Sequence, residues 1–242
     1  MYSDTDQRDF WNKWNVSREE TRGRVSSEQR QVILRWMDRL GRRNLDIVEV
    51  GCGAGWLCAD LVKYGHVVGT DLSDDVLARA AQRLPEADFI AGDFLALDFG
   101  ARQFDVVVTL ETLTHVADQP GFMRKCAHLL KPRGVLMMAT QNRTALEKNK
   151  LPAPERGQYR RWVDHRELTD LLGDDFEVEE LFSITPKFNR GPLKLVNSER
   201  VRRPLRAIGL GPLVDAATRM QEKAWLGWTL MALARNREPR SA

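Results

Sequence analysis

The sequence predicts an α/β fold built on a parallel sheet. From residue 45 onwards, short apolar runs alternate with stretches of helical periodicity, which is the pattern of repeated βαβ units. The first apolar run passes directly into a glycine-rich loop, as strands do at the ligand-binding edge of such sheets. The length of 242 residues, 43% of them hydrophobic, suits one α/β domain that folds without covalent cross-links.

The first 44 residues are expected to form an N-terminal lid and a helix. Trp11 and Trp14 stand in an otherwise polar opening segment, either as part of a lid or as ordinary packing of a terminal helix. Ser26 and Gln29 then form a capping-box pattern that predicts a helix start. Gly41 is placed to end this helix, whose apolar face is formed by Val32, Ile33, Trp36, Met37 and Leu40.

The middle of the chain contains five apolar runs that predict buried strands. They lie at residues 45–50, 66–70, 88–91, 104–110 and 135–139. Helices are expected between them at residues 56–64, 73–84 and 120–130. The second should have Ser73 as its N-cap, and Asp74 and Asp75 in its first turn complement the helix dipole.

The last hundred residues predict a loop, a helix and two strands that enclose a basic segment. The loop covers residues 141–158, the helix 164–172, and the strands 176–184 and 228–234. Between the strands, a basic amphipathic insertion at about residues 186–224 is predicted to form short helices on the rim of the fold, broken by Pro192, Pro204 and Pro212.

Charge is unevenly distributed along the chain. The whole sequence carries 37 Lys and Arg against 34 Asp and Glu, a formal charge of +3. Residues 187–223 hold nine basic and three acidic residues, or +6, so the remainder sums to about −3. This distribution argues against a protein that wraps nucleic acid over its whole surface.

Cysteine usage and the N-terminus predict a reducing, cytoplasmic location. Cys52, Cys58 and Cys126 are odd in number and include no C-x-x-C pair, so neither a disulfide framework nor a zinc ribbon is expected. The N-terminus lacks the basic start and apolar run of a signal peptide, and no window approaches a membrane-spanning length of uncharged apolar residues.

The glycine loop at residues 48–56 is the strongest functional signal. Glycines allow a tight turn and close backbone approach, and a helix start favours a negatively charged ligand group. Trp56 occupies the position of the last glycine in the dinucleotide fingerprint, so the spacing G-x-G-x-G makes a pyrophosphate-binding site less favoured. The alternative is a tight strand–helix turn without a ligand.

Two carboxylates follow the next strands. Asp71 ends the second apolar run, twenty residues after Gly51, where a carboxylate can accept hydrogen bonds from both hydroxyls of a ribose. The alternative is a carboxylate that stabilises the adjacent helix start. Asp93 and Phe94 end the third run and suit the amine and ring of an adenine, or else form a solvated turn beside a core aromatic residue.

The chain resembles the class I S-adenosylmethionine-dependent methyltransferases over roughly residues 45–140. The motifs that carry the resemblance are E-V-G-C-G-A-G, V-V-G-T-D, A-G-D-F, F-D-V-V-V-T-L-E-T-L-T-H-V and L-L-K-P-R-G-V-L. It implies a Rossmann-like, doubly wound, seven-stranded sheet with a reversed last strand. It also implies S-adenosylmethionine as cofactor, with S-adenosylhomocysteine as product, bound by Glu49, Gly51, Cys52, Gly53, Gly55, Asp71, Leu72, Asp93, Phe94 and Leu110.

Within this family the segment L-E-T-L-T-H-V is most similar to ubiquinone-biosynthesis-type and related sugar and natural-product O-methyltransferases. Those enzymes commonly carry a second Glu before the His, where this chain has Thr114, so a metal-free mechanism is expected. His115 is the predicted catalytic base, because a neutral imidazole can take the proton of an attacking hydroxyl. The alternative is a histidine that packs or positions the substrate.

Other residues are candidate substrate contacts. Glu111 either contacts the methionine amino group or the acceptor, or is a structural carboxylate at a strand end. His165 either lines the acceptor site or is a solvated first-turn residue. Trp11 and Trp14 are candidates to cover the cofactor sulfonium through cation–π contact. Arg202 and Arg203 represent the basic segment, which is a solvated rim, a site for an anionic substrate, or a patch for peripheral contact with membranes that carry lipid-linked acceptors.

The sequence therefore predicts methyl transfer to a hydroxyl of a small molecule such as a sugar, a phenol or a lipid-linked acceptor. N-methyl transfer to a small amine and a non-catalytic cofactor-binding protein are the alternatives. RNA methylation is disfavoured, because the chain shows neither a separate RNA-binding module nor an N/D-P-P-Y-type tetrad.

Overall fold

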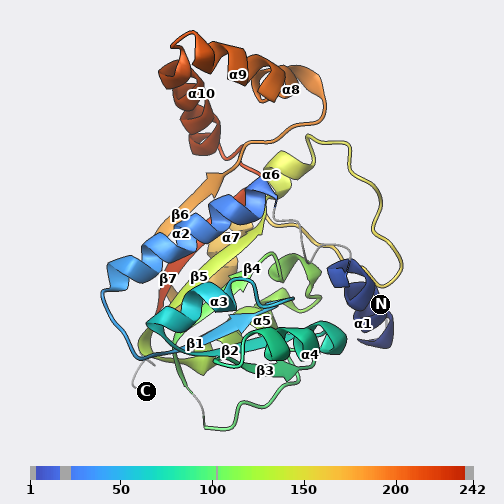
Figure 1. Cartoon of the computed structure of the whole chain (residues 1–242), viewed down its shortest axis with the longest axis vertical. Coiled ribbons are helices and arrows are strands. Elements are labelled where there is room, and N and C mark those ends of the chain that lie inside the picture. Colours follow the sequence, from blue (N-terminus) through green and yellow to red (C-terminus); the bar gives the residue numbers. More distant parts are fainter. Residues whose placement is uncertain (1–3, 17–22, 102, 238–242) are drawn as a thin grey trace.

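A mixed seven-stranded sheet forms the centre of the molecule (Figure 1). The computed structural model describes residues 4–16, 23–101 and 103–237. The strand order is β3-β2-β1-β4-β5-β7-β6, and β7 runs antiparallel to both of its neighbours, which confirms the doubly wound sheet with a reversed last strand. The strands are β1 Leu45–Val50, β2 Gly65–Asp71, β3 Asp88–Ala91, β4 Phe104–Leu110, β5 Leu130–Gln141, β6 Phe176–Ile184 and β7 Thr229–Asn236.

The central strands are buried on both faces, as their continuous apolar runs predict. In β4, Val106 and Val108 pack into one apolar cluster, whereas Val107 packs into the other. Helices cover the two faces: α2, α3 and α4 contribute to the first cluster, and α5 and α7 to the second. The helices of the body are α1 Asp4–Val16, α2 Arg24–Leu40, α3 Cys58–Leu61, α4 Asp74–Arg83, α5 Gln119–Leu129, α6 Arg143–Leu146 and α7 His165–Leu172.

Some predicted helix boundaries were wrong in detail. The helix predicted at residues 56–64 is a turn followed by α3 and a short 3₁₀ helix, Val62–Tyr64. The loop predicted at 141–158 begins with α6, which Asn142 caps by accepting from the Thr144 N–H at 3.2 Å. Ser73 does precede α4, but its hydroxyl donates to Asn12 of α1 instead of capping the helix.

The start of α2 corrects the predicted capping box. The helix begins at Arg24 with Gly23 as its N-cap, and that cap has no side-chain hydrogen bond. Ser26 lies inside the first turn, and Gln29 is 2% exposed and turned toward β4 and β7. Gln29 of the S-x-x-Q pattern therefore makes a buried contact instead of capping the helix. The predicted end is confirmed, since Gly41 adopts a left-handed φ of +62°.

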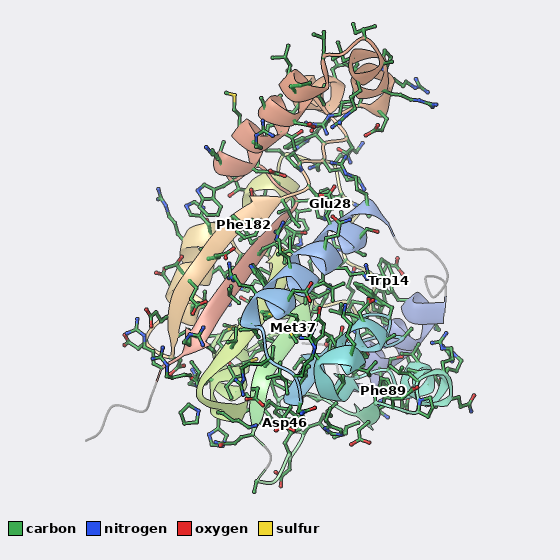
Figure 2. The ribbon with its side chains drawn as sticks, turned by 60° about the vertical axis from the view of Figure 1, so that its left-hand side comes forward. Trp14, Glu28, Met37, Asp46, Phe89 and Phe182 are labelled. Atoms are coloured by element: carbon green, nitrogen blue, oxygen red, sulfur yellow. The ribbon has the colours of Figure 1, made fainter. Side chains whose placement is uncertain are left out.

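Three helices between β6 and β7 form a separate cap beyond the end of the sheet (Figures 1 and 2). They are α8 Gly191–Val196, α9 Glu199–Ala207 and α10 Gly211–Lys223. Pro192 and Pro212 lie in the first turns of α8 and α10 and so separate the helices as predicted, but Pro204 lies inside α9 and does not break it. The two ends of the cap meet at a neck, where the Trp228 N–H donates to the Thr185 carbonyl at 3.1 Å.

The strand order reverses between β1 and β4, which leave a crevice at their carboxyl ends. Val50 pairs with Thr70 of β2 and with Thr109 of β4, so the three strands end at one level. The loops that follow them therefore converge on one site. In the part of the chain that the structure describes, every helix is too short or too polar to cross a membrane.

Candidate functional site

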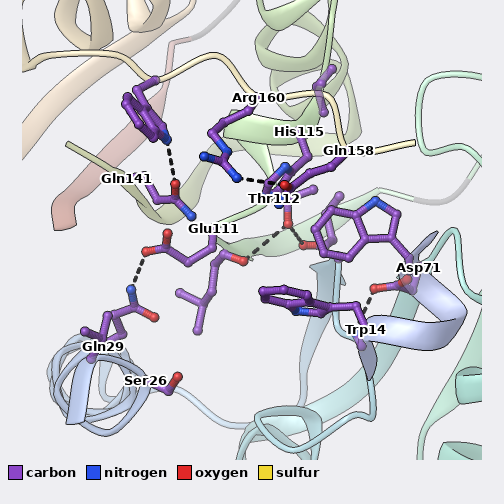
Figure 3. Close-up of a pocket in the computed structure, with 18 of the residues that line it drawn as sticks. Trp14, Ser26, Gln29, Asp71, Glu111, Thr112, His115, Gln141, Gln158 and Arg160 are labelled. Carbon is purple, nitrogen blue, oxygen red and sulfur yellow. Dashed lines mark hydrogen bonds between the residues drawn. The ribbon is translucent and has the colours of Figure 1, made fainter. Parts of the chain in front are cut away.

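A cavity of about 1360 Å³ opens at the carboxyl ends of β1, β2 and β4 (Figure 3). It exceeds the roughly 300–1,000 Å³ typical of ligand pockets, so a nucleotide-sized cofactor and a second molecule have room together. Thirteen of the predicted site residues line it: Trp11, Trp14, Glu49, Gly51, Cys52, Gly53, Asp71, Leu72, Asp93, Phe94, Leu110, Glu111 and His115.

Gly51 makes the turn from β1 possible. Its φ is +74°, and a Cβ at this position would lie 2.0 Å from Thr112 Oγ1. Thr112 Oγ1 in turn donates to the Val50 carbonyl at 3.0 Å, so the turn is held against the end of β4. A side chain here would both strain the backbone and displace Thr112.

Asp71 is held at the tip of β2 by backbone groups. Its two carboxylate oxygens accept from the N–H groups of Gly53 at 2.8 Å and Ser73 at 2.9 Å. Burial raises the pKa of Asp71 above its ordinary value, although these N–H groups oppose the effect. Each oxygen retains a further acceptor position, which suits the two hydroxyls of a ribose.

Glu49 is a buried carboxylate at the base of the glycine loop. It is 2% exposed, and the Cys58 thiol donates to it at 2.9 Å. Burial raises the pKa of Glu49 well above its ordinary range. A cationic group beside it would remove that penalty, so the residue suits the amino group of an amino-acid ligand.

Asp93 and Phe94 follow β3 at the far wall of the cavity. Asp93 Oδ1 accepts from the Leu95 N–H at 3.1 Å, so its other oxygen is available to a ligand amine. Phe94 is 7% exposed and packs against Phe122 with ring centroids 5.1 Å apart. The ring therefore contributes to the core as well as to the cavity wall.

His115 lies at the end of the short 3₁₀ helix Leu113–His115, with one nitrogen committed. Nδ1 lies 2.8 Å from the Tyr159 carbonyl oxygen, and because a carbonyl can accept but not donate, Nδ1 carries the hydrogen. In the neutral ring Nε2 is therefore the proton acceptor. Burial lowers the pKa of His115 to about 4, with a further contribution from Arg160, so the ring is neutral around pH 7.

Glu111 joins three elements beside the cavity. It accepts a hydrogen bond from Gln29 of α2 (Figure 3) and another from Thr229 Oγ1 of β7, the latter at 3.2 Å. Its backbone is in the left-handed region, with φ of +63°. Burial raises the pKa of Glu111 to about 7. Such backbone strain and such a pKa cluster at functional sites.

The loop before α7 contributes a cationic wall that the sequence predictions missed. Arg160 donates to the Pro152 carbonyl at 2.9 Å and to Gln158 Oε1 at 2.7 Å. Within the described residues its guanidinium makes no ion pair, and burial lowers its pKa. Trp162 beside it donates to Gln141 Oε1 at 2.8 Å. The signal available in the sequence was the cluster Y-R-R-W inside an otherwise polar loop.

The N-terminal helix closes one side of the cavity. Trp11 packs edge-on against His115, with ring centroids 4.5 Å apart. Asn12 fixes α1 to the start of α4 by donating to Asp74 Oδ1 at 3.2 Å and accepting from Ser73. The placement agrees with a lid, although the predicted cation–π role of Trp11 and Trp14 stays a prediction.

Four predicted site residues lie outside the cavity lining. Gly55 packs against Phe89, 3.1 Å from the position of a Cβ, and so serves the contact between the loop and β3. His165 stacks on Trp225 at 4.2 Å. Arg202 and Arg203 belong to α9, where Arg202 is 4% exposed and holds the cap together.

Thr114, which replaces the second Glu of the resembling enzymes, also faces away from the cavity. It is fully buried, and its Oγ1 lies 3.3 Å from Thr140 Oγ1 of β5. Cys52, Cys58 and Cys126 are buried and free.

Known proteins resemble this chain at the level of both sequence and fold. Residues 48–138 match the family model of a methyltransferase domain. A probable S-adenosylmethionine-dependent methyltransferase of Mycolicibacterium smegmatis is 32% identical over 57% of this chain and 54% of its own length. A ubiquinone biosynthesis O-methyltransferase of Sinorhizobium medicae is 31% identical over 69% of this chain and 60% of its own length.

The solved structures include the N-methyltransferase NodS from Bradyrhizobium japonicum in complex with S-adenosylhomocysteine. It has a TM-score of 0.66 and 15% identity, and the alignment covers 96% of this chain and 100% of that one. At this identity the likeness concerns the fold alone. The chain spans 54% and 60% of the two curated relatives. The resemblance that the sequence motifs indicate is confirmed.

Proposed function

We propose that the chain methylates a hydroxyl of a small anionic molecule, because residues 48–138 match a methyltransferase domain and the sequence is similar to that of S-adenosylmethionine-dependent methyltransferases. S-adenosylmethionine is the cofactor of this family, and when bound it supplies an electrophilic methyl group on a sulfonium. Glu49 and the glycine loop would hold its amino-acid end, Asp71 the ribose, and Leu72, Asp93 and Phe94 the adenine.

The protonation state of His115 carries the proposal for O-methyl transfer. Its Nδ1–H is fixed by the Tyr159 carbonyl, which leaves Nε2 as the basic nitrogen in the wall of the cavity that Asp71 and the glycine loop also line. A hydroxyl gains nucleophilic strength when its proton is accepted during attack. His115 would accept that proton, and the other residues of the wall would orient the acceptor.

Arg160 supports an anionic acceptor. It lines the same cavity as His115, and the described part of the chain offers its guanidinium no carboxylate partner. A partly buried cation without a carboxylate partner favours an incoming carboxylate or phosphate, which a guanidinium can bind through two hydrogen bonds. The acceptor would then carry an anionic group beside the hydroxyl that is methylated.

The test begins with the purified chain, S-adenosylmethionine and a cell extract. Mass spectrometry should detect an acceptor that becomes one methylene heavier. With that acceptor, His115→Ala should lower kcat by about 10²–10⁴, the usual contribution of a general base, and leave S-adenosylhomocysteine affinity unchanged. His128→Ala, an exposed histidine of α5, is the matched control.

Three outcomes would contradict the proposal. A methylated amine, with only a mild effect of His115→Ala, would identify an N-methyltransferase. Tight S-adenosylhomocysteine binding without any methylated product would identify a non-catalytic binding protein. A hydroxyl acceptor that a folded His115→Ala variant methylates at more than about half the wild-type rate would exclude His115 as the base.

A further inference from the structure

The cap collects almost all of the exposed apolar side chains of the described chain. In the part of the chain that the structure describes, eight large hydrophobic residues are exposed, and all but Val178 lie in the cap or its connections. Ile208 is 71% exposed and Met220 72%. The others are Leu195, Val196, Val201, Leu210 and Leu213. Scattered apolar residues are normal on a surface, but their concentration in one small subdomain indicates an interaction face.

The cap leaves these side chains outside because its own centre is mainly polar. Its buried residues are Arg202, Val214 and Gln221. Arg202 donates to the Val196 carbonyl at 3.0 Å, to Asn197 Oδ1 at 2.6 Å and to Thr218 Oγ1 at 3.1 Å, which joins α8, α9 and α10. Hydrogen bonds from one arginine thus connect all three helices.

The longest helix of the cap presents its exposed apolar residues on one side. Leu213 and Met220 are seven residues apart in α10, which places them two turns apart on the same face. Leu213 is 65% exposed. Ile208 and Leu210 continue the apolar surface in the short connection from α9 to α10.

The cations of the cap supply the second feature of this surface. Residues 191–223 contain seven Lys and Arg and three acidic residues. Arg206 pairs with Asp215, and Glu199 lies 3.7 Å from Arg24 of α2. Five exposed cations make no ion pair with any residue that the structure describes: Lys194, Arg200, Arg203, Arg219 and Lys223.

The cap also borders the cavity. Asn197 and Glu199 belong to the cavity lining, together with Lys187 on the segment that leads from β6 into the cap. The part of the cap that contains Asn197 and Glu199 therefore borders the cavity, whereas the apolar residues of the cap are exposed to solvent.

We propose that the cap docks the protein on an anionic lipid surface. Exposed apolar side chains on short helices enter the boundary between headgroups and acyl chains, and unpaired Lys and Arg beside them attract anionic headgroups. The surplus of cations complements such a surface and disfavours a second copy of the same positively charged cap. Docking itself does not rest on the proposed function.

Co-sedimentation of the full chain with vesicles tests the docking. Binding should be strong to vesicles of phosphatidylcholine and phosphatidylglycerol in equal parts, weak to phosphatidylcholine alone, and reduced by salt. Arg203→Gln with Arg219→Gln should weaken binding at least about tenfold, since each charge contributes about fivefold. Arg124→Gln with Arg166→Gln changes the net charge equally outside the cap and should have no such effect.

The apolar contribution is tested by Leu213→Gln with Met220→Gln, which should also weaken binding about tenfold or more. Val178→Gln, which removes the exposed apolar residue outside the cap, is its control. Every variant should keep wild-type affinity for S-adenosylhomocysteine in calorimetry, which shows that the cofactor end is folded and separates this test from that of the proposed function.

Three results would overturn the docking proposal. The first is wild-type protein that does not sediment with anionic vesicles. The second is binding that the cap variants retain. The third is a dimer in light scattering that Leu213→Gln with Met220→Gln converts to monomer, because a second copy would then cover the face.

Discussion

The two ends of the cavity are built in different ways. At the cofactor end, Gly51, Gly53 and Asp71 come from consecutive strand tips, and backbone groups make the main contacts. At the acceptor end, Gln29, Glu111 and Thr229 come from segments up to 200 residues apart, and side chains contact side chains. Backbone contacts constrain local sequence tightly, whereas side-chain networks can be rebuilt residue by residue.

The pKa values of the two carboxylates, Asp71 at the cofactor end and Glu111 at the acceptor end, show this contrast. Asp71 accepts from two backbone N–H groups that oppose the effect of burial. Glu111 accepts from side chains, and burial raises its pKa to about 7. Substitutions at the two ends should therefore separate cofactor binding, acceptor binding and pH dependence.

The largest expected effect is on stability at Glu111. Its folded pKa of about 7 lies above the ordinary 4.5, so its contribution to stability is complete below pH 4.5 and is lost as pH rises through 7. The unfolding free energy of wild type minus that of Glu111→Gln should fall by about 3 kcal/mol across this range, given about 1.4 kcal/mol for each pKa unit. Chemical denaturation at several pH values measures it.

The measurement compares wild type with a variant because His115 changes the unfolding free energy with pH in the opposite direction. Its folded pKa of about 4 lies below the ordinary 6.5, so its contribution is present above pH 6.5 and is lost as pH falls through 4. Glu147→Gln, at an exposed glutamate, is the control substitution. A difference for Glu111→Gln that stays constant between about pH 5 and 8 would contradict the raised pKa.

At the cofactor end, Asp71→Asn should weaken S-adenosylhomocysteine binding about 10- to 100-fold. The loss corresponds to about 1.5–3 kcal/mol for hydrogen bonds to a charged group. The acceptor KM should not change. Calorimetry measures the affinity, and Asp75→Asn in the first turn of α4 is the control. Unchanged affinity, or tight binding of NAD by the wild type, would refute the placement of the ribose.

At the acceptor end, Arg160→Gln should raise the acceptor KM about tenfold, as expected from loss of one charge-assisted contact. The affinity for S-adenosylhomocysteine should stay at the wild-type value. The neighbouring exposed Arg161 provides the control substitution Arg161→Gln. Equal effects of the two substitutions would show that general charge, and not Arg160, governs acceptor binding.

The smallest effect is expected in the pH profile of the wild-type rate. His115 has a pKa of about 4, so its base form is fully present and kcat should vary less than about twofold between pH 6 and 8. Steady-state kinetics with a non-ionising acceptor hydroxyl measures this. A fall in kcat on acidification, centred near pH 7, would assign the proton transfer to Glu111.

The difference between the two ends also explains which predictions from sequence succeeded. The doubly wound sheet with a reversed last strand follows from the resemblance that the contiguous motifs carry, and the placement of Asp71 beside the glycine loop follows from the geometry of parallel sheets. Gln29 was predicted to cap a helix, because its contact with Glu111 spans 82 residues and leaves no local pattern. Arg160 was missed for the same reason, since its wall forms only when a polar loop folds over His115.

The neck at Thr185 and Trp228 has a consequence for how this chain can vary. Since the segment between them starts and stops at one point of the sheet, a change in its length need not shift the two strands, and the loop-closure entropy grows slowly with length. The register of β6 and β7 on either side is set by their own pairing, from Ile184 with Thr229 onward. An insert joined in this way can change in length, in charge or in sequence while the strands keep their partners. The neck is therefore a position where a different segment can be attached to the same sheet.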